Sequence, residues 1–516
     1  MRYSERLTAR PLPESRKDPP VSSPRITFSA DAASSIEADV LVLGAVQGAD
    51  GPTIVASEAF SEIAAQFALV GFSGKADELL KLPALQGAAQ AVAVIGLGSD
   101  TSADAIRYAA GSAVRQLAGK SSVVFGFALA TENELGALVE GASLGAYSFT
   151  EFRGKTKAAQ KAPVASIIVA TALELTHAVL DRISVIGDVV NLVKDLVNTP
   201  GAQLYPAAFG DRATEAAAGI PDLMVEVWDE KKLAAERCGG IIGIGQGSSR
   251  QPRLIKVSYS PAAATRHLAF VGKGITFDTG GYSLKPAEAM LTMHHDMGGA
   301  AAVLAVTLAA ARLKVNVKIT TWLCVAENMV SSTAIRVNDV LTMRDGTTVE
   351  VINTDAEGRL VMADGLALAS EQSPDAIIDI ATLTGAAIVS LGRRTAGVMG
   401  DPDLVSRIAA AGDVTGEKHW PMPLPHELRA LLDSKFADMS NLSAANRDGG
   451  MLVAGIFLRE FVGTGADGTT KIPWAHLDIA GTGTNNGPGY GFTGDGGTGA
   501  SVRTVLTVVE EFAARS

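Results

Sequence analysis

The chain has 516 residues, too many for one ordinary hydrophobic core, so two domains or more are expected. Its 47% hydrophobic and 19% charged residues are typical of a globular protein and exclude a disordered or fibrous one. The 44 Lys and Arg residues against 55 Asp and Glu residues give a net charge of -11, which disfavours general nucleic-acid binding because a phosphate backbone would be repelled.

The beginning of the chain mixes arginines with acidic residues and prolines and has no apolar core. This composition predicts a flexible tail at residues 1–25 and not a secretory signal. No apolar run reaches the roughly 18 to 20 residues that cross a bilayer, and we interpret the alanine-rich stretch 298–313 as a core helix. Cys238 and Cys324 lie in apolar surroundings, which indicates two buried thiols in a reducing compartment. We therefore expect a cytoplasmic protein that does not contact membranes.

Strands and helices alternate through residues 26–175, which predicts an N-terminal α/β domain with a largely parallel sheet. Strands are expected at residues 39–46, 91–97, 123–128 and 166–170, and helices at residues 103–117 and 134–146. The basic stretch 153–161 is interpreted as a solvated turn, with a binding patch as the alternative. Apolar residues three and four apart at 183–197 predict a helix that ends before Pro200, so residues 176–200 are interpreted as a connecting helix.

The alternation resumes in residues 201–516, which predicts a larger, catalytic C-terminal domain with a mixed or largely parallel sheet flanked by helices. Strands are expected at residues 223–228, 254–259, 268–272, 317–326, 349–353, 376–381 and 476–479, and helices at 298–313, at 361–371 and from residue 503. The glycines at 239–247 miss the register of a dinucleotide-binding motif and predict a turn with close backbone packing.

Charged residues gather in one glycine-rich stretch of this second region. Lys273 and Lys285 are interleaved with Asp278 and Asp296 just beyond the strand predicted at 268–272. The end of a strand in an α/β sheet is where such proteins tend to place their chemistry. This stretch is therefore the first candidate for the functional site.

A second charged fragment, Asp355, Glu357 and Arg359, lies at a predicted strand-to-helix junction. Together with Asp278 and Asp296 it offers four carboxylates, which could converge only around a cation because unpaired they would repel one another and take up protons. Carboxylate oxygens suit Mg, Mn or Zn. Four carboxylates exceed what one catalytic metal needs, so we favour two divalent metals; a cap or turn role remains the alternative for any single aspartate.

The basic residues suggest three different roles. Lys273 could ligate a metal only as the neutral amine, with its pKa lowered from about 10.4. Lys285 can stay charged and point at a substrate, and the planar fork of Arg359 suits a carboxylate or bicarbonate. A solvated surface charge is the alternative for each. Because the chain contains no HExxH motif, a mononuclear zincin is disfavoured.

Five short sequence motifs resemble those of a known family: VGKGITFDTGG, YSLKP, DMGGAA, NTDAEGRL and ATLTG. On these the chain resembles the leucyl aminopeptidase (cytosol aminopeptidase) family of two-metal exopeptidases. Good resemblance covers roughly residue 195 to the end. It implies an enzyme that removes the N-terminal residue, with leucine-like residues preferred, from peptides through a dinuclear metal centre and a metal-activated water. Mn or Zn is implied, with Mg or Co as alternatives, and family members are homohexamers.

The resemblance also assigns roles to individual residues. The tighter metal would be held by Lys273, Asp278, Asp296 and Glu357, and the more exchangeable one by Asp278, Asp355 and Glu357. Lys285 would assist at the scissile carbonyl, while Arg359 would position a bicarbonate with help from the main chain near Leu383. The pocket for the first side chain would be shaped by Met293, Thr382 and Gly385.

Two other functions remain open from the residues alone. A two-metal phosphohydrolase would use similar carboxylates but usually needs more cationic side chains around the phosphoryl group. The chain could also act mainly as a binding protein through its N-terminal domain. Comparing the hydrolysis of leucine p-nitroanilide with that of p-nitrophenyl phosphate distinguishes an aminopeptidase from a phosphohydrolase. A gel-shift assay at physiological salt tests nucleic-acid binding.

Overall fold

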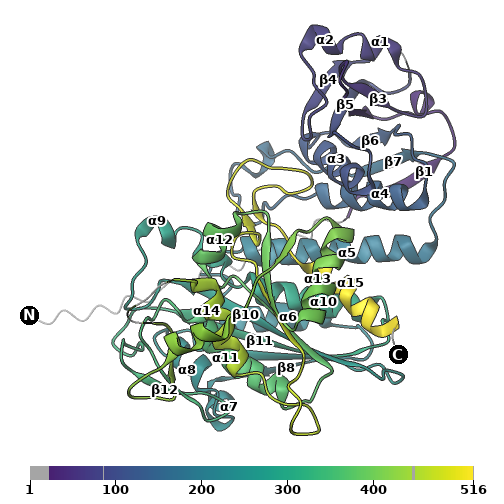
Figure 1. Cartoon of the computed structure of the whole chain (residues 1–516). Helices are drawn as coiled ribbons and strands as arrows, with labels where there is room; N and C mark the ends of the chain where they lie inside the picture. Colours follow the sequence, from purple (N-terminus) through teal and green to yellow (C-terminus); the bar gives the residue numbers. More distant parts are fainter. Residues whose placement is uncertain (1–22, 85–86, 444, 446–447, 515–516) are drawn as a thin grey trace, which may run out of the picture.

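The computed structural model describes residues 23–84, 87–443, 445 and 448–514, and two large sheets organise them (Figure 1). One sheet lies between residues 25 and 170, in what we call the N-terminal lobe. The other lies between residues 223 and 478, in the larger C-terminal lobe. Most of the tail predicted at residues 1–25 falls outside the described residues, but Arg25 already begins a strand. The predicted α/β class is confirmed.

The sheet of the N-terminal lobe has the order β1-β7-β6-β2-β5-β4, with β3 paired to β2. Its first five strands in that order run parallel, whereas β3 and β4 run antiparallel to their neighbours. The strands are β1 (Arg25–Ser29), β2 (Val40–Val46), β3 (Thr53–Val55), β4 (Leu79–Pro83), β5 (Ala91–Gly98), β6 (Ser122–Phe125) and β7 (Ser166–Ala170). The predicted strands are therefore confirmed, and the unpredicted β1, β3 and β4 are short and partly exposed.

Short helices and two long ones accompany this sheet. They are η1 (Ala33–Ser35), α1 (Ser61–Ala64), α2 (Phe67–Val70), α3 (Ala103–Gln116), α4 (Glu132–Gly145) and η2 (Lys157–Ala159). The hydroxyls of Ser102 and Thr131 accept backbone N–H groups at the starts of α3 and α4, as N-caps do. The connecting helix is α5 (His177–Asn198), which Thr176 caps. It begins before the predicted residue 183 and ends ahead of Pro200.

The sheet of the C-terminal lobe has the order β16-β15-β18-β14-β10-β11-β9-β8. Its centre, from β18 to β11, is parallel, so the strand ends there meet at one edge. The strands are β8 (Leu223–Trp228), β9 (Arg253–Tyr259), β10 (His267–Asp278), β11 (Lys318–Asn328), β14 (Ala376–Ala381), β15 (Ala396–Gly400), β16 (His419–Pro421) and β18 (Trp474–Asp478). Small ribbons add β12 (Val340–Thr342), β13 (Thr348–Glu350), β17 (Met439–Ser440), β19 (Thr484–Asn485) and β20 (Gly496–Gly497).

Helices cover both faces of this sheet, which explains why its central strands are apolar throughout. Leu268 and Phe270 belong to one apolar cluster with residues of α5, α6, α10, α13 and α15, whereas Ala269 and Val271 belong to another with residues of α8, α11 and α14. The helices are α6 (Pro206–Ala217), α7 (Glu230–Ala235), α8 (Gly239–Gly245), α9 (Ala287–Met290), η3 (Met293–His295), α10 (Gly298–Arg312), α11 (Gly358–Ser370), α12 (Gly385–Leu391), α13 (Pro402–Thr415), η4 (His426–Leu432), α14 (Gly450–Glu460) and α15 (Val502–Ala514).

The structure also bears on helix 298–313, on the two cysteines and on membrane-spanning helices. The interpretation of residues 298–313 as a core helix is confirmed, because α10 is buried along almost its whole length. Cys238 and Cys324 are buried free thiols, as expected. Among the described residues, no helix combines the length and the apolar character that a membrane crossing requires.

The prediction of a turn at residues 239–247 is wrong, because the first seven of these residues form helix α8. Glycine costs a helix about 1 kcal/mol per residue, which is why the sequence favoured a turn. The predicted close backbone packing is confirmed: a Cβ on Gly240 would lie 2.2 Å from the carbonyl oxygen of Leu360 on α11. Contact between the two helix backbones compensates for the poor helix propensity.

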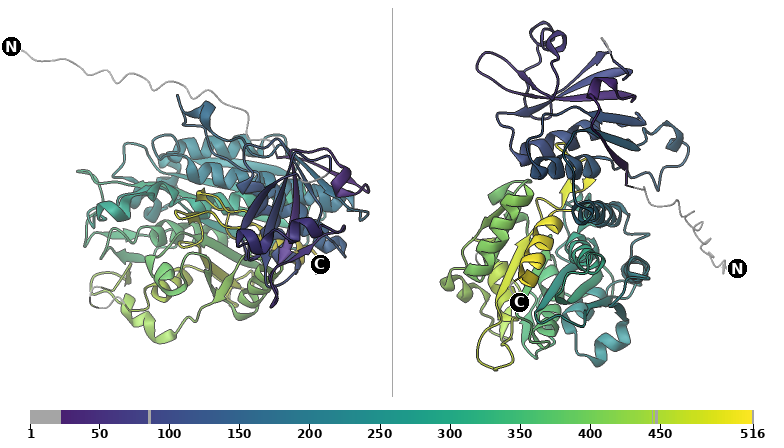
Figure 2. Two further views of the ribbon diagram at one scale, coloured as in Figure 1. Left: turned by 90° about the horizontal axis from the view of Figure 1, so that it is seen from above. Right: turned by 90° about the vertical axis from the view of Figure 1, so that its right-hand side faces the viewer.

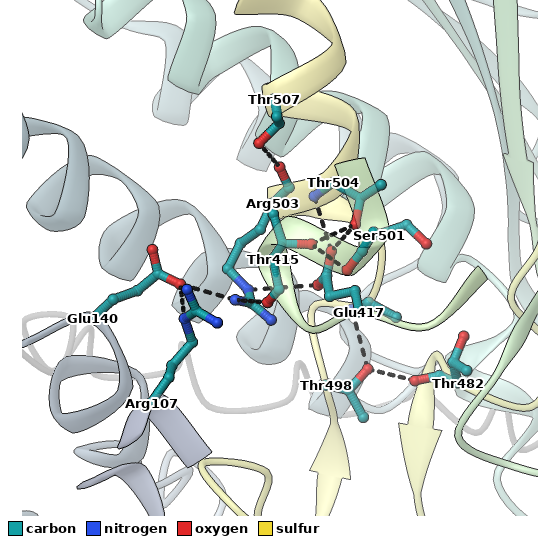
Figure 3. A network of polar contacts seen from close by, with 12 residues as sticks. Arg107, Glu140, Thr415, Glu417, Thr482, Thr498, Ser501, Arg503, Thr504 and Thr507 are labelled. Atoms are coloured by element: carbon teal, nitrogen blue, oxygen red, sulfur yellow. Dashed lines mark hydrogen bonds and ion pairs between the residues drawn. The ribbon is translucent and has the colours of Figure 1, made fainter. Parts of the chain in front are cut away.

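The two lobes form distinct bodies joined along one side (Figures 1 and 2). The segment that follows β18 reaches up to the N-terminal lobe, where the N–H of Gly491 donates to Asp77 Oδ1 at 2.8 Å. A buried ionic network lies beside it (Figure 3). Arg503 of α15 donates to Glu140 Oε1 of α4 at 2.8 Å, and Arg107 Nε of α3 lies 3.0 Å from the same oxygen.

Removing Glu140 from this network is expected to destabilise the protein. In Glu140→Ala, two buried guanidinium groups lose one carboxylate partner, although Arg107 keeps Asp104 and Arg503 keeps Glu417, so the free energy of unfolding should fall by about 1.5 to 3 kcal/mol. Urea unfolding measures this, with Arg336→Ala in the exposed Arg336–Asp339 pair as the control, for which a loss below about 1 kcal/mol is expected. Equal losses in both variants would contradict the expectation.

The contribution of Glu140 to the free energy of unfolding should depend on pH. Burial acts to raise the pKa of Glu140, but Arg503 and Arg107 outweigh it and hold the pKa below its ordinary value of 4.5. A carboxyl with a lowered pKa in the folded state stabilises fully above its unfolded pKa, and this stabilisation is lost as the pH falls through the lowered pKa. The difference between wild type and Glu140→Ala should therefore be constant near neutral pH and shrink only below about pH 4.5.

Candidate metal centre

Strand β10 supplies the first two charged side chains of the site. It extends beyond the predicted 268–272, so Lys273 lies inside the strand and Asp278 is its last residue. Gly280 follows with a φ of +83°, in the left-handed region that suits glycine. The N–H of Lys285 then donates to Thr279 O at 3.0 Å, and this bond brings Lys285 back over the end of β10.

The second charged fragment approaches the end of β10 from the start of α11. The side chain of Asn353 accepts the N–H of Asp355 at 2.7 Å, which fixes the turn that leads into the helix. Glu357 directly precedes α11. A Cβ on Gly358 would lie 2.6 Å from Lys273 Cε, so glycine is needed there for the lysine to cross the helix N-terminus. The two charged fragments thus meet at the carboxyl end of the central parallel strands.

Two lysines join the four carboxylates into one cluster. Lys273 Nζ lies 2.8 Å from Asp296 Oδ2 and 2.8 Å from Glu357 Oε1, with all three side chains buried. Lys285 Nζ lies 2.8 Å from Asp278 Oδ2 and 2.5 Å from Asp355 Oδ1. Asp278, Asp355 and Glu357 can each place an oxygen within 4.8 Å of the others, whereas Asp296 joins the cluster through Lys273.

Crowded, buried negative charge dominates the electrostatics of this cluster. Burial, followed by the charges of Glu357 and Asp296, raises the pKa of Asp278 to about 8. Burial also raises the pKa of Asp296 to about 6, although Lys273 opposes it. For Lys273 the balance is reversed: burial disfavours its charge, but the carboxylates of Asp296 and Glu357 outweigh burial and raise its pKa.

The donor set fits a divalent cation. Glu357 Oε2 is buried and has no hydrogen-bond partner in the described part of the chain. Such an atom carries a desolvation cost that a cation would remove. Hard or borderline ions such as Mg, Mn and Zn prefer carboxylate oxygens. The site therefore has both the ligand chemistry and an unsatisfied ligand atom that metal binding would use.

Arg359 and Leu383 lie beside the cluster and line a cavity of about 270 Å³, together with Asp355 and Gly385. Arg359 Nη1 donates to Asn441 O at 2.9 Å, while its Nε has no hydrogen-bond partner among the described residues. Burial lowers the pKa of Arg359 to about 10, against the opposing charge of Glu357. A Cβ on Gly385 would meet nothing within 4 Å, so this part of the cavity wall is open to a ligand.

The other two residues expected around the substrate lie on different elements. Thr382 follows β14, and its hydroxyl donates to Asp296 Oδ1 at 2.7 Å. Its carbonyl oxygen accepts Lys273 Nζ at 3.1 Å. Met293 begins η3, three residues before Asp296, and is half-buried. Thr382 thus contacts the charged cluster through its side chain and carbonyl, whereas Met293 contacts it through its carbonyl oxygen, which accepts the N–H of Asp296 at 3.5 Å.

Two polar residues of the site were missed from the sequence. The amide of Asn328, at the end of β11, donates to Asp278 Oδ1 at 2.8 Å. Asp478, at the end of β18, accepts the N–H of Leu383 at 3.2 Å. Both stand at the carboxyl ends of strands that neighbour β10 or β14. The rule that such ends gather at one edge, applied to the predicted strands 317–326 and 476–479, could have indicated them.

Comparisons with known families match most of the chain. A model of the catalytic domain of the cytosol aminopeptidase family matches residues 191–506, and a model of that family's N-terminal domain matches residues 45–156. A probable cytosol aminopeptidase of Leifsonia xyli subsp. xyli is 54% identical over 498 residues, covering 96% of this chain and 100% of the relative.

Two solved structures have a similar fold. The bottromycin maturation enzyme BotP in complex with Mn superposes with a TM-score of 0.80 at 35% identity, covering 92% of this chain and 100% of that one. A mutant of tomato leucine aminopeptidase superposes with a TM-score of 0.83 at 26% identity, covering 96% of this chain and 98% of that one. The similarity extends over both lobes.

Proposed function

Because the chain belongs to the cytosol aminopeptidase family, it is a metal-dependent aminopeptidase acting on peptides, and we propose that five of its side chains hold two divalent cations. The five are Lys273, Asp278, Asp296, Asp355 and Glu357. The observation that carries the proposal is the convergence of three carboxylates within 4.8 Å, because these are the three expected at the more exchangeable position. Mn or Zn is the proposed metal, with Mg or Co as alternatives, and the Mn complex of a similar fold supports Mn.

The chain's own residues have distinct tasks in this proposal. Two bound cations supply Lewis acidity, which polarises the scissile carbonyl and acidifies water. Lys273 is charged in the metal-free cluster, so it must lose its proton before its amine can act as a ligand. The ammonium of Lys285, held by Asp278 and Asp355 at the rim of the cluster, is placed to stabilise negative charge that develops on the carbonyl oxygen.

Arg359 is proposed to hold a small anion, with bicarbonate as the candidate base. Its unpartnered Nε and its place on the cavity wall support this assignment. The N–H of Leu383, expected to help, donates to Asp478, so it would share its hydrogen between that carboxylate and an anion. Met293, Thr382 and Gly385 are proposed to shape the pocket for the N-terminal side chain, which favours leucine-like residues.

Further proposals concern the whole molecule. We propose an N-terminal domain at residues 26–175, a connecting helix at 176–200 and a catalytic domain at 201–516, because α5 separates the two sheets. A cytoplasmic location is supported by the name of the relatives. A homohexamer is proposed from the family resemblance, and light scattering coupled to size exclusion tests it.

Hydrolysis assays test the function directly. The Mn²⁺-loaded enzyme should release p-nitroaniline from leucine p-nitroanilide, and treatment with a chelator should abolish the activity until Mn²⁺ is restored. The same preparation should leave p-nitrophenyl phosphate intact. Hydrolysis of the phosphate ester without hydrolysis of the amide would favour a phosphohydrolase and overturn the proposal.

Metal affinity is expected to rise with pH. Because the pKa of Asp278 is about 8 in the metal-free cluster, most of this group carries a proton below pH 8 that a cation must displace. The affinity for Mn²⁺ should therefore increase between pH 6 and 8, by up to about a hundredfold per pH unit if the protons of both Asp278 and Lys273 are released, and should rise less steeply above pH 8, where only Lys273 still carries its proton. Calorimetric titrations in buffers of different ionisation enthalpy count the protons. An affinity that is constant over this range would contradict the expectation.

A further inference from the structure

The segment after β14, residues 382–384, contacts the charged cluster on one side. The carbonyl oxygen of Thr382 accepts Lys273 Nζ at 3.1 Å, and its hydroxyl donates to Asp296 Oδ1 at 2.7 Å. Both partners are buried. A shift of this short segment would therefore move two of the five proposed metal-binding side chains.

Asp478 holds the same segment from the other side. It is 1% exposed and ends β18, in register with Ala381 at the end of β14. Its Oδ1 accepts the N–H groups of Leu383 at 3.2 Å and Ala480 at 3.1 Å, and its Oδ2 accepts the hydroxyl of Thr384 at 2.7 Å. One buried carboxylate thus engages two of the three residues of the segment.

Thr384 extends this arrangement into the cavity wall. Its hydroxyl oxygen also accepts the N–H of Ala387 at 3.0 Å and so caps α12. Helix α12 begins at Gly385, which lines the cavity beside Arg359. Asp478 therefore sets the position of both the Thr382 carbonyl and the first turn of α12.

We propose that Asp478 is a positioning residue for the reaction: it fixes residues 382–384 so that Thr382 can orient Lys273 and Asp296. This inference rests on the proposed function, in which those two side chains are metal ligands. Partners of metal ligands typically matter 10- to 100-fold for metal affinity or activity. Asp478 acts one step further out, through Thr382, and touches no ligand itself.

A carboxylate suits this task because it is only an acceptor, and all three groups facing it are donors. Asparagine would keep the oxygen that serves Leu383 and Ala480. Its NH₂ group would meet the hydroxyl of Thr384, which would then have to turn its hydrogen away from residue 478. Asp478→Asn should therefore retain part of the arrangement, whereas Asp478→Ala should lose all of it.

The chain offers a matched control in Asp364, a buried carboxylate on α11. It accepts the N–H groups of Ile241 and Arg344, both at 2.9 Å, and has no bond to residues 382–384. Asp364→Ala removes a buried carboxylate with backbone donors, as Asp478→Ala does. The two variants should therefore share any general loss of stability but differ in their effect on the site.

Steady-state kinetics with leucine p-nitroanilide, Mn²⁺ affinity and melting temperature test the proposal together. Asp478→Ala should lower kcat about 10- to 100-fold and weaken Mn²⁺ binding, and Asp478→Asn should recover part of both kcat and Mn²⁺ affinity. Asp364→Ala should lower the melting temperature and leave kcat unchanged. A kcat and Mn²⁺ affinity within twofold of wild type for Asp478→Ala would overturn the proposal.

Two further measurements keep the result decisive. Where Asp478→Ala does not fold, Asp478→Asn decides: a kcat within twofold of wild type at normal metal content overturns the proposal, and a larger fall at a wild-type melting temperature supports it. Asp278→Ala, measured in parallel, tests the proposed metal site itself. Loss of metal in Asp278→Ala with wild-type behaviour of Asp478→Ala rejects only the positioning role, whereas full metal content in Asp278→Ala rejects the metal site.

Discussion

Replacing Asp278 by alanine is expected to remove most of the bound metal and to lower kcat more than about 10²-fold, the upper end for residues that merely support a ligand. Asp278 forms one group with Asp355 and Glu357, and its pKa is raised by burial first and then by the charges of Glu357 and Asp296. Its loss would remove an oxygen shared between both proposed metal positions. Elemental analysis of the purified variant measures the metal, and hydrolysis of leucine p-nitroanilide measures the rate.

A matched aspartate outside the site makes this result specific. Asp345 is exposed and accepts the N–H of Thr347 at 2.9 Å in a surface turn. Asp345→Ala should keep the wild-type metal content and rate. Full metal occupancy in Asp278→Ala would show that this carboxylate does not bridge the cations, and the assignment of the centre would then be wrong.

Lys285→Ala should lower kcat about 10²- to 10³-fold, by analogy with the loss of one oxyanion donor. The ammonium of Lys285 is paired with Asp278 and Asp355 at the open side of the cluster, and its side chain is 14% exposed, so it can reach a substrate. Unlike Asp278, it is not a proposed ligand. The variant should therefore keep its metal while it loses turnover.

Measuring metal content and rate separately distinguishes a metal ligand, such as Asp278, from a residue that stabilises charge on the carbonyl oxygen, such as Lys285. The exposed Lys435 is a suitable control, because its replacement by alanine removes a lysine charge away from the cluster and should leave kcat unchanged. A Lys285→Ala variant with more than half of wild-type turnover would remove Lys285 from the mechanism. Loss of metal in the same variant would indicate that the lysine supports the ligands instead.

The sequence predicted the central strands of both lobes and the charged fragments at their ends, because buried parallel strands leave continuous apolar runs. It did not predict helix α8, whose glycines have poor helix propensity and are held by contact with α11. The strand predicted at 268–272 is too short, because the charge of Lys273 interrupts the apolar run whereas β10 continues to Asp278.

By itself, the sequence determined which chemical groups are available: four carboxylates, two lysines and an arginine in two short motifs near strand ends. Only the tertiary structure decided that Asp278, Asp355 and Glu357 form one group while Asp296 is held through Lys273. It also brought Asn328 and Asp478 to the same edge. The reason is the strand order β18-β14-β10-β11, which places residues far apart in the chain side by side and is set by packing across the whole sheet, not by any local pattern.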